Sequence, residues 1–423
     1  MGAAPSIGIV GGGQLAWMLA EAARRRGVEL HVQTPGAQDP AVSLATSVIQ
    51  ADVRDVAATR ELASRCSAVS FENEWVDLDG LAPLAADGVR FFPNLEALRP
   101  LVCKRSQREL LNRFNLPSPA WFPLERVHEP PEPAEPADGD SNGAATPNPA
   151  PAVASPQLPP GFAYPLMAKA ASGGYDGKGT AVLRSDADLD GLLARVDASN
   201  WIVEEFVSFE LELAVVAARD QFGDVVCLPV VQTHQHQQVC DWVLAPYEAP
   251  HALQQAVRNM AASLLTALNY VGVLSIELFY GPRGLMINEL APRTHNSGHY
   301  SIEACDLSQF DLQLLAVSGQ QLSEPALQSP GALMVNLLGF EARGAEDPAA
   351  AYEGQRQALA ALPDAHLHWY GKAGASLGRK LGHVTLLLQQ RDPAARRQEA
   401  MQRLEQVRQI WPLPPGSEAD QSS

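Results

Sequence analysis

The stretch SIELFYGPRGLMINELAPRTHNSGH, residues 275–299, carries the most structural information in this sequence. Residues 274–280 and 285–290 are apolar runs of strand length, and the turn GPRG at 281–284 separates them. Glycine and proline in a short connection between two such runs are typical of a β-hairpin. We therefore expect two antiparallel strands here.

The register of this hairpin brings two acids together. If Phe279 pairs with Ile287, Glu277 falls opposite Glu289 on the same face. Like charges directly opposite each other destabilise a sheet unless a counter-ion lies between them. Carboxylates and the amide oxygen of Asn288 are hard ligands that suit Mg²⁺ shared with nucleotide phosphates. The sequence predicts a magnesium site at this pair, and the alternative of an exposed acidic face is disfavoured because the flanking residues are so apolar.

A polar loop follows the second strand directly. Arg293 can bind a carboxylate or phosphate through two parallel hydrogen bonds, and His295 and Asn296 can orient an oxyanion. A single histidine in a loop is usually incidental, but this group adjoins the predicted metal site. We expect an anion to be handled beside the metal.

A glycine-rich loop, SGGYDGKG at 172–179, lies between expected strands at 164–169 and 180–183. No helix follows it, so it is not a Walker loop. Four glycines give a flap whose N–H groups can close over a triphosphate, with Lys178 and Lys169 adding charge. The alternative is a long glycine-rich hairpin.

The segment EEFV at 204–207 ends another expected strand. Its backbone can offer hydrogen bonds to adenine, and Glu212 can accept from ribose hydroxyls. On their own these residues are weak indicators, because charged strand ends are usually just solvated.

The N-terminal segment GGGQLA at 11–16 follows an apolar run at 6–10 and opens a helical pattern, which predicts a parallel α/β sheet. It fits the dinucleotide fingerprint, but the second strand ends at Val32, Gln33 and Thr34 without the required acid. A nicotinamide cofactor therefore loses support. An anion bound at the helix N-terminus and a tight packing turn remain equally open.

Three cations, Lys372, Arg379 and Lys380, lie close together near the C-terminus. In a chain with a formal net charge of -17 they mark either an anion site or an ordinary basic turn. The same acidic balance makes nucleic acid and membrane surfaces poor partners. The five cysteines form no C-x-x-C pair, which favours a reducing compartment and a cytoplasmic protein. Residues 126–160 are dense in Pro, Ala and acidic residues, and we interpret them as a flexible surface insertion.

The motifs GGYDGKG (173–179), IELF (276–279), NELAPRTHNSGH (288–299) and GRKLGH (378–383), with GGGQL (11–15), resemble the N5-carboxyaminoimidazole ribonucleotide synthetase family of purine biosynthesis. NELAPRTHNSGH is highly specific, whereas GGGQL alone is not. The resemblance covers nearly the whole chain except residues 126–160 and the segment after about residue 391.

The resemblance implies an α/β chain that is α+β in its ATP-grasp part. The expected parts are a Rossmann-like preATP-grasp domain at 1–98, an ATP-grasp domain at 99–318 with a glycine-flap lid at about 162–205, a small β-rich domain at 319–391 and a tail at 392–423. The resemblance also implies a homodimer. The expected reaction uses ATP and Mg²⁺ to carboxylate 5-aminoimidazole ribonucleotide with bicarbonate, via carboxyphosphate.

The resemblance carries over to site residues position by position. Positions matching nucleotide contacts are Lys104, Lys169, Gly174, Tyr175, Asp176, Gly177, Lys178, Gly179, Thr180, Glu204, Glu205, Phe206, Val207, Glu212, Gln235, Asn288 and Glu289. The metal ligands match Glu277 and Glu289, and the bicarbonate and carboxyphosphate site matches Arg293, His295 and Asn296, on which Tyr175 and Asp176 of the flap would close. The ribonucleotide would face Gly13, Gln14, Glu72, Lys372, Arg379 and Lys380.

Two features depart from the family pattern, and one alternative function remains. A family histidine that contacts ATP aligns with Gln235, so His234, Gln235 and His236 are all candidates for that contact. The insertion at 126–160 has no counterpart. The alternative is another ATP-grasp ligase, such as a formate-dependent glycinamide ribonucleotide transformylase, which would share the metal strand but use another acyl donor.

Overall fold

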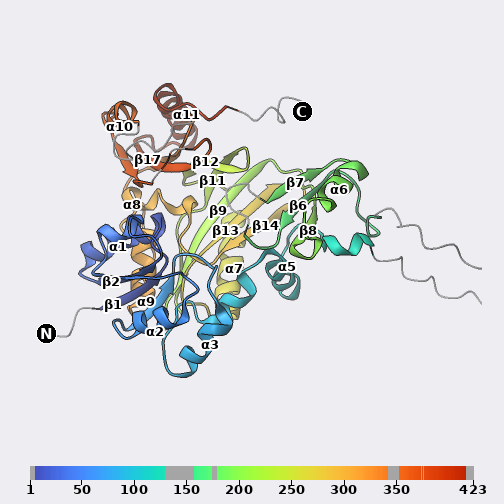
Figure 1. Ribbon diagram of the computed structural model, residues 1–423. Helices are drawn as coiled ribbons and strands as arrows, with labels where there is room; N and C mark the ends of the chain where they lie inside the picture. Colours follow the sequence, from blue (N-terminus) through green and yellow to red (C-terminus); the bar gives the residue numbers. More distant parts are fainter. Residues whose placement is uncertain are drawn as a thin grey trace, which may run out of the picture.

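The computed structural model describes residues 5–128, 157–173, 179–341, 352–372, 374 and 376–415. These residues form three sheets, which we call the N-terminal sheet, the small sheet and the large sheet. Figure 1 shows the large sheet in the middle of the molecule, with the other two on either side of it. Among the described residues, no helix combines the length and apolarity that crossing a bilayer requires.

The N-terminal sheet is parallel, as its strand–helix alternation predicts, and has the order β3-β2-β1-β4. Its elements are β1 (Ser6–Val10), α1 (Gln14–Arg26), β2 (Glu29–Thr34), β3 (Ser47–Gln50), α2 (Val56–Ala63), β4 (Ala68–Phe71), α3 (Leu78–Ala86) and α4 (Leu95–Leu98). Helix α1 ends at Gly27, whose φ of 66° is left-handed and suits glycine.

Two details of this region differ from the sequence-based expectation. The edge strand β3 was not expected, because only one of its residues, Ile49, is buried and no apolar run marks it. The strand expected at 90–92 is reduced to an isolated bridge between Val69 and Phe91. Pro93 has no N–H to donate, so the ladder cannot extend beyond this point.

The small sheet has the order β5-β8-β6-β7 and lies to the right in Figure 1. Its elements are β5 (Trp121–Pro123), β6 (Leu166–Ala170), β7 (Thr180–Leu183), α6 (Asp186–Leu193) and β8 (Trp201–Glu205). Phe122, Leu166, Leu189 and Val203 belong to its own buried cluster. Most of the expected insertion, residues 129–156, lies outside the described residues.

The large sheet has the order β14-β13-β9-β11-β12-β15-β17-β16, and β10 pairs with β9. Its strands are β9 (Leu211–Arg219), β10 (Val225–Cys227), β11 (Val231–His236), β12 (Val239–Ala245), β13 (Gly272–Gly281), β14 (Gly284–Ala291), β15 (Gly331–Leu338), β16 (Ala365–Trp369) and β17 (Lys380–Leu388). The helices that pack around it are α5 (Lys104–Arg113), α7 (His251–Ala267), α8 (Ser301–Ala304), α9 (Gln309–Val317), α10 (Glu353–Ala360) and α11 (Pro393–Ile410). The single strand expected near 225–232 is divided into β10 and β11, because Pro229 interrupts the ladder.

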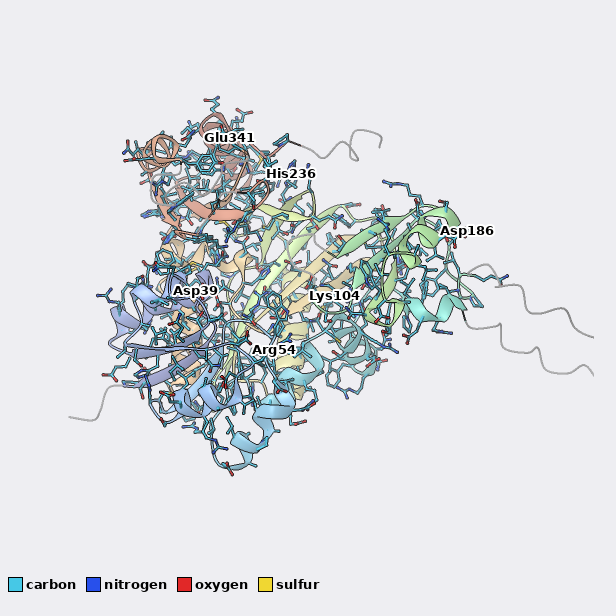
Figure 2. All side chains as sticks on the ribbon, in the orientation of Figure 1. Asp39, Arg54, Lys104, Asp186, His236 and Glu341 are labelled. Carbon is cyan, nitrogen blue, oxygen red and sulfur yellow. The ribbon has the colours of Figure 1, made fainter. Side chains whose placement is uncertain are left out.

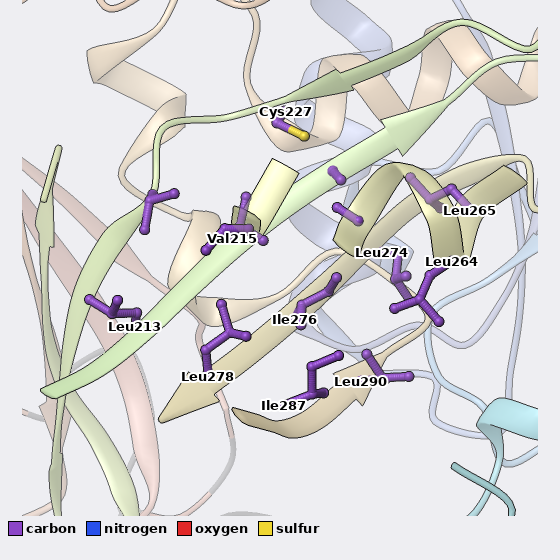
Figure 3. Packing of buried hydrophobic residues seen from close by; sticks show 14 of the residues in the cluster. Leu213, Val215, Cys227, Leu264, Leu265, Leu274, Ile276, Leu278, Ile287 and Leu290 are labelled. Atoms are coloured by element: carbon purple, nitrogen blue, oxygen red, sulfur yellow. The ribbon is translucent and has the colours of Figure 1, made fainter. Parts of the chain in front are cut away.

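The main core of the large sheet lies between its hairpin and α7. Figure 3 shows Leu264 and Leu265 of α7 against Leu274 and Ile276 of β13. This apolar packing fixes one face of β13. The polar residues Glu277 and Glu289 are consequently held on the opposite face.

The C-terminal strands β15, β17 and β16 continue the large sheet, because β12 pairs with β15. Asp392 caps the start of helix α11, because its side chain accepts a hydrogen bond from the N–H of Ala395 (2.9 Å), and the helix packs on β15 and β17. Trp411 is fully buried, and its indole N–H donates to the Leu338 carbonyl (2.8 Å). The expectation of a tail from residue 392 is therefore wrong for residues 393–411. Its surface is mostly charged, so its few buried positions do not stand out in the sequence.

Candidate active site

The hairpin β13–β14 pairs Glu277 with Glu289, as the sequence predicts. The predicted pairing of Phe279 with Ile287 is wrong, because Leu278 pairs with Ile287 and Phe279 pairs with Met286. The register shifts between Glu277 and Leu278, which makes Asn288 the extra residue of a β-bulge. A bulge disturbs the alternation of side chains and re-aims one of them, and a period-two pattern does not reveal it.

Arg108 of α5 holds this bulge by its backbone. Its Nη1 donates to the Ile287 carbonyl (3.1 Å) and its Nη2 to the Asn288 carbonyl (2.6 Å). Its Nε lies 2.6 Å from Glu204. Arg108 was not among the residues predicted from the sequence, although its place four residues after Lys104 puts both on one helix face.

Lys169 completes a buried group of charges with Glu204 and Arg108. Its Nζ lies 2.7 Å from Glu204 Oε2 and donates to Asn288 Oδ1 at 3.0 Å. Burial lowers the pKa of Lys169, and Glu204 opposes that effect. Burial would raise the pKa of Glu204, but the two cations outweigh it and the pKa is lowered. Glu204 therefore carries its charge inside the protein and aims Lys169 at the bulge.

Lys104, the first residue of α5, neutralises one of the paired acids. Its Nζ lies 2.6 Å from Glu289 Oε1, and Figure 2 labels it between the small sheet and the body of the molecule. Burial opposes ionisation of Glu289, yet Lys104 lowers its pKa below the usual range. Burial and then the charge of Glu289 raise the pKa of Glu277. The pair thus has one firmly ionised carboxylate and one whose pKa is raised.

The donor set at this pair fits a magnesium ion. Within the described ranges, no three or more His, Cys, Asp or Glu side chains gather in a group that could hold a metal. Mg²⁺ is usually held by one or two carboxylates together with substrate phosphates and water. Two directly opposed carboxylates, one of them with a raised pKa, match that pattern.

The loop after β14 lies against the acidic pair. His295 Nε2 is 3.5 Å from Glu277 Oε1. Arg293 Nε is 3.1 Å from Glu74 Oε2, a partner from the N-terminal region that the sequence analysis did not select. Asn296 is buried, and its amide exchanges two hydrogen bonds of 2.8 and 2.7 Å with the amide of Asn336. An oxyanion therefore has access to Asn296 only through its remaining N–H.

Strand β9 pairs Ala214 with Glu277 and Glu212 with Phe279. Residues two apart in a strand point to the same face, so Glu212 lies on the face of the acidic pair. Burial and then the charge of Glu277 raise the pKa of Glu212 to about 7. Gln235 pairs with Cys240, which packs with Ala214 on this face.

The two flanking histidines differ from Gln235 in their orientation. His234 pairs with Trp242 on the opposite face, and the two rings stack with centroids 5.2 Å apart. His236 pairs with Val239. It is adjacent to Gln235 in the strand, so its side chain points to the opposite face. The register therefore favours Gln235 among the three candidates.

The remaining nucleotide positions lie around the small sheet. Glu205 Oε2 is 2.6 Å from Arg283, and its Oε1 accepts from the Ala120 N–H (2.9 Å), so this side chain fixes the end of β8. Phe206 follows and is 48% exposed, and Val207 comes next. Gly179 directly precedes β7, and Thr180, the first residue of β7, donates to Gln238 at the tip of the β11–β12 hairpin. The predicted flap residues Gly174, Tyr175, Asp176, Gly177 and Lys178 lie outside the described residues.

At the N-terminal loop, Glu72 occupies the start of α1. Its carboxylate accepts from the N–H groups of Gly13 (2.7 Å), Leu15 (3.1 Å) and Ala16 (3.3 Å). A Cβ on Gly13 would lie 2.6 Å from Glu72 Oε1, so a larger residue here would displace the Glu72 carboxylate. The tight-turn interpretation thus has direct support, and the anion at this helix end is the protein's own carboxylate. Gln14 Oε1 is buried beside it with no hydrogen-bond partner in the described structure.

The three C-terminal cations lie in the segment that follows β16, which meets α1 through Tyr370 and Trp17. Lys372 Nζ donates to the Lys380 carbonyl (3.1 Å) and lies 5.3 Å from the centre of the Tyr370 ring, which in turn meets Trp17 of α1 at 6.4 Å. Arg379 donates to the Gly374 carbonyl (2.9 Å). The charge of Lys380 lowers the pKa of Glu277, after the larger effects of burial, Glu289 and Lys104. The fold therefore brings the start of α1 next to the C-terminal segment that carries Lys372.

Three family models match this chain. They describe a ribonucleotide synthetase preATP-grasp domain at residues 5–101, an ATP-grasp domain at 153–310 and a phosphoribosylaminoimidazole carboxylase C-terminal domain at 332–397. N5-carboxyaminoimidazole ribonucleotide synthase from Synechococcus elongatus is 47% identical over 408 residues, which are 96% of each protein.

Solved structures give the same result. Carboxyaminoimidazole ribonucleotide synthase from Aspergillus clavatus, complexed with ATP, superimposes with a TM-score of 0.79 at 27% identity and covers 96% of this chain and 99% of that one. The enzyme from the same fungus in complex with ADP and 5-aminoimidazole ribonucleotide gives a TM-score of 0.77 at 25% identity, with coverage of 96% and 99%.

Proposed function

Because this chain belongs to the N5-carboxyaminoimidazole ribonucleotide synthase family, we propose that it uses ATP and bicarbonate to carboxylate the amine of 5-aminoimidazole ribonucleotide. The products are N5-carboxyaminoimidazole ribonucleotide, ADP and phosphate. The observation that carries the proposal is the contact between the acidic pair and the following loop, where His295 lies 3.5 Å from Glu277. The two features that such a reaction requires, a phosphate site and a site for a small oxyanion, are therefore neighbours.

ATP binds between the small sheet and the large sheet in this proposal. Lys104 and Lys169 contact its phosphates, and Asn288 lies beside them. Glu212 accepts hydrogen bonds from the ribose, and Gln235 supplies the contact that a histidine makes in relatives. The backbone of residues 204–207 receives adenine, beside the half-exposed Phe206.

Glu277 and Glu289 would hold Mg²⁺, which when bound supplies positive charge to the phosphates as the γ-phosphoryl group transfers. Lys104 and Lys169 would add further positive charge beside the phosphates. Since Lys104 already lies 2.6 Å from Glu289, it would exchange part of this contact for a phosphate oxygen when the nucleotide binds.

Bicarbonate is a poor electrophile, and its conversion to carboxyphosphate supplies a leaving group. In the first step bicarbonate oxygen attacks the γ-phosphorus and ADP leaves. In the second the ribonucleotide amine attacks the carboxyl carbon, phosphate leaves and the amine loses a proton. Arg293, His295 and Asn296 would orient the small anion through both steps. Carboxyphosphate hydrolyses easily, so closure of the flap at 172–179, with Tyr175 and Asp176, would exclude water.

The ribonucleotide would bind on the side of the N-terminal sheet. Its contacts would be Gly13, Gln14, Glu72, Lys372, Arg379 and Lys380. The unpartnered Oε1 of Gln14 and the cations near it offer complementary groups for hydroxyls and a phosphate. Glu72 would keep the loop at the start of α1 in shape while its ligand binds.

The proposal is tested by phosphate release from purified protein supplied with Mg·ATP. Release that requires both bicarbonate and 5-aminoimidazole ribonucleotide supports it. Release that requires formate and glycinamide ribonucleotide instead would overturn it. We further propose a homodimer in the cytoplasm. The mass in solution tests the dimer, and the position of a tagged copy in the producing cell tests the compartment.

A further inference from the structure

Gln309, the first residue of α9, is fully buried and contacts the loop that carries His295. Its Oε1 accepts from the His295 N–H at 2.8 Å. Its Nε2 donates to the His295 carbonyl at 2.8 Å and lies 2.9 Å from Nδ1 of His299. One side chain thus holds both backbone groups of His295 and the imidazole that ends the loop.

The hydrogen-bonding capacity of this amide is fully used. A glutamine has two N–H donors and a carbonyl acceptor, and Gln309 directs both donors and the acceptor at the loop. Because its Nε2 donates to His299 Nδ1, that imidazole carries its proton on Nε2. Burial lowers the pKa of His299 well below its usual range, so the ring is neutral. The arrangement therefore admits a single orientation of the amide and a single tautomer of His299.

Gln309 is itself rigidly placed. Its backbone N–H donates to Ser301 Oγ (3.0 Å), and Ser301 Oγ donates to the Gly298 carbonyl (2.5 Å). Ser308 before it forms a capping box with Asp311. A Cβ on Gly298 would lie 2.7 Å from Gln309 Oε1, so the loop packs directly on the amide. Movement of the loop would break these contacts together.

We propose that Gln309 is a positioning residue for the reaction, which holds the His295 side chain beside Glu277. The inference rests on the proposed function, in which His295 orients bicarbonate and carboxyphosphate. His295 Nε2 is 3.5 Å from Glu277, and its backbone on both sides of Cα is held by Gln309. Gln309 lies behind the loop, so it supports the oxyanion site without forming part of the nucleotide site.

Two substitutions separate positioning from general stability. Gln309→Met keeps the length of the side chain and removes every hydrogen bond that the side chain makes. Gln309→Glu keeps the shape and the acceptor for the His295 N–H and removes both donors, which leaves the His295 carbonyl and His299 Nδ1 facing a carboxylate.

Gln313→Met is the matched control, one turn further along α9. Gln313 is also buried, accepts from the Val273 N–H (2.7 Å) and donates to Ser70 Oγ (2.9 Å). It makes comparable hydrogen bonds to another strand, away from the loop. The same substitution there removes similar interactions from the same helix.

The experiment measures kcat and the KM for ATP in the presence of saturating bicarbonate and 5-aminoimidazole ribonucleotide, with the folded fraction determined by thermal melting. Because misplacement of a reacting group by about 1 Å lowers rates by about 100-fold, Gln309→Met and Gln309→Glu should lower kcat by about that factor per folded site. Their KM for ATP should stay within about twofold, and Gln313→Met should keep kcat within about threefold.

Equal kcat values per folded site for the variants at 309 and 313 would overturn the inference, as would a KM for ATP that rises as much as kcat falls. Gln309→Glu keeps the test decisive if the methionine variant does not fold. A wild-type protein without turnover that depends on bicarbonate would refute the proposed function and this inference with it. The two failures are therefore distinguishable.

Discussion

Replacing Glu204 by Gln removes the carboxylate that lies between Arg108 and Lys169. The side chains of Arg108 and Glu204 are 3% and 2% exposed, so solvent does not screen the charges that remain. Removal of one partner from such a buried pair typically costs about 3–5 kcal/mol, because the other charge is left uncompensated. At about 2–4 °C per kcal/mol for a cooperative unit of 150–250 residues, we expect a Tm lower by about 6–20 °C.

The same change should weaken ATP binding. Burial already lowers the pKa of Lys169, and Glu204 is the largest effect that opposes it. Without that carboxylate the pKa falls further, and the ammonium is lost as pH rises through the new value. The KM for ATP should therefore increase by about tenfold or more, and the increase should be larger at pH 8.5 than at pH 7.

Glu205→Gln is the control for stability alone, with the same substitution at the next residue. Its partner Arg283 is 59% exposed, and such surface pairs contribute about 0–1 kcal/mol. Thermal melting and steady-state kinetics on both variants provide the assay. If Glu204→Gln melts within about 3 °C of the wild-type protein and keeps its KM for ATP, the buried charge group does not organise the nucleotide site and the reasoning is refuted.

Three further changes test other parts of the structure. Trp411→Ala removes a fully buried indole and should lower stability by about 3–5 kcal/mol, seen as a lower Tm, with turnover at 20 °C retained; an unchanged Tm would contradict the packing of α11. His299 and His383 are buried, and burial holds the pKa of each well below its usual range, so only the unfolded chain gains protons there as pH falls below about 6.5. These two histidines should together contribute a fall in stability of about 2.7 kcal/mol per pH unit below that value, and His383→Gln should remove about half of that contribution from the slope in denaturant titrations while the exposed His366→Gln should not. Glu289→Ala should abolish ATP turnover with a Tm change below about 3 °C, and normal turnover would refute the magnesium assignment.

The hairpin could be predicted from sequence because its two apolar runs and its turn are local. Opposition of Glu277 and Glu289 followed from that pattern and is confirmed. The bulge at Asn288 could not be predicted, because it depends on Arg108, which holds the backbone carbonyls of the bulge from another helix. A contact across such a distance in the chain leaves no local period.

The supporting residues of the site were missed for the same reason. Gln309 and Asn336 are ordinary amides in the sequence, and their roles arise from a helix start and a strand that pack behind the loop. Glu72 shows the converse case. The sequence left a bound anion and a tight packing turn equally open at this helix N-terminus, and the fold places a carboxylate there from the end of β4.

The continuity of the large sheet constrains how the enzyme can open. The main-chain ladder between β12 and β15, from Trp242 opposite Val335 to Ala245 opposite Ala332, joins the hairpin side to the C-terminal side. A rotation between these two sides would break that ladder, so they form one rigid plate. Within the described structure the small sheet has no strand pairing with this plate, and side-chain contacts join the two, among them Lys169 to Asn288, Glu205 to Arg283 and Thr180 to Gln238. Nucleotide exchange should therefore work as a swing of the small sheet about these contacts, while the distance between the hairpin β13–β14 and the C-terminal strands β15 and β17 stays constant.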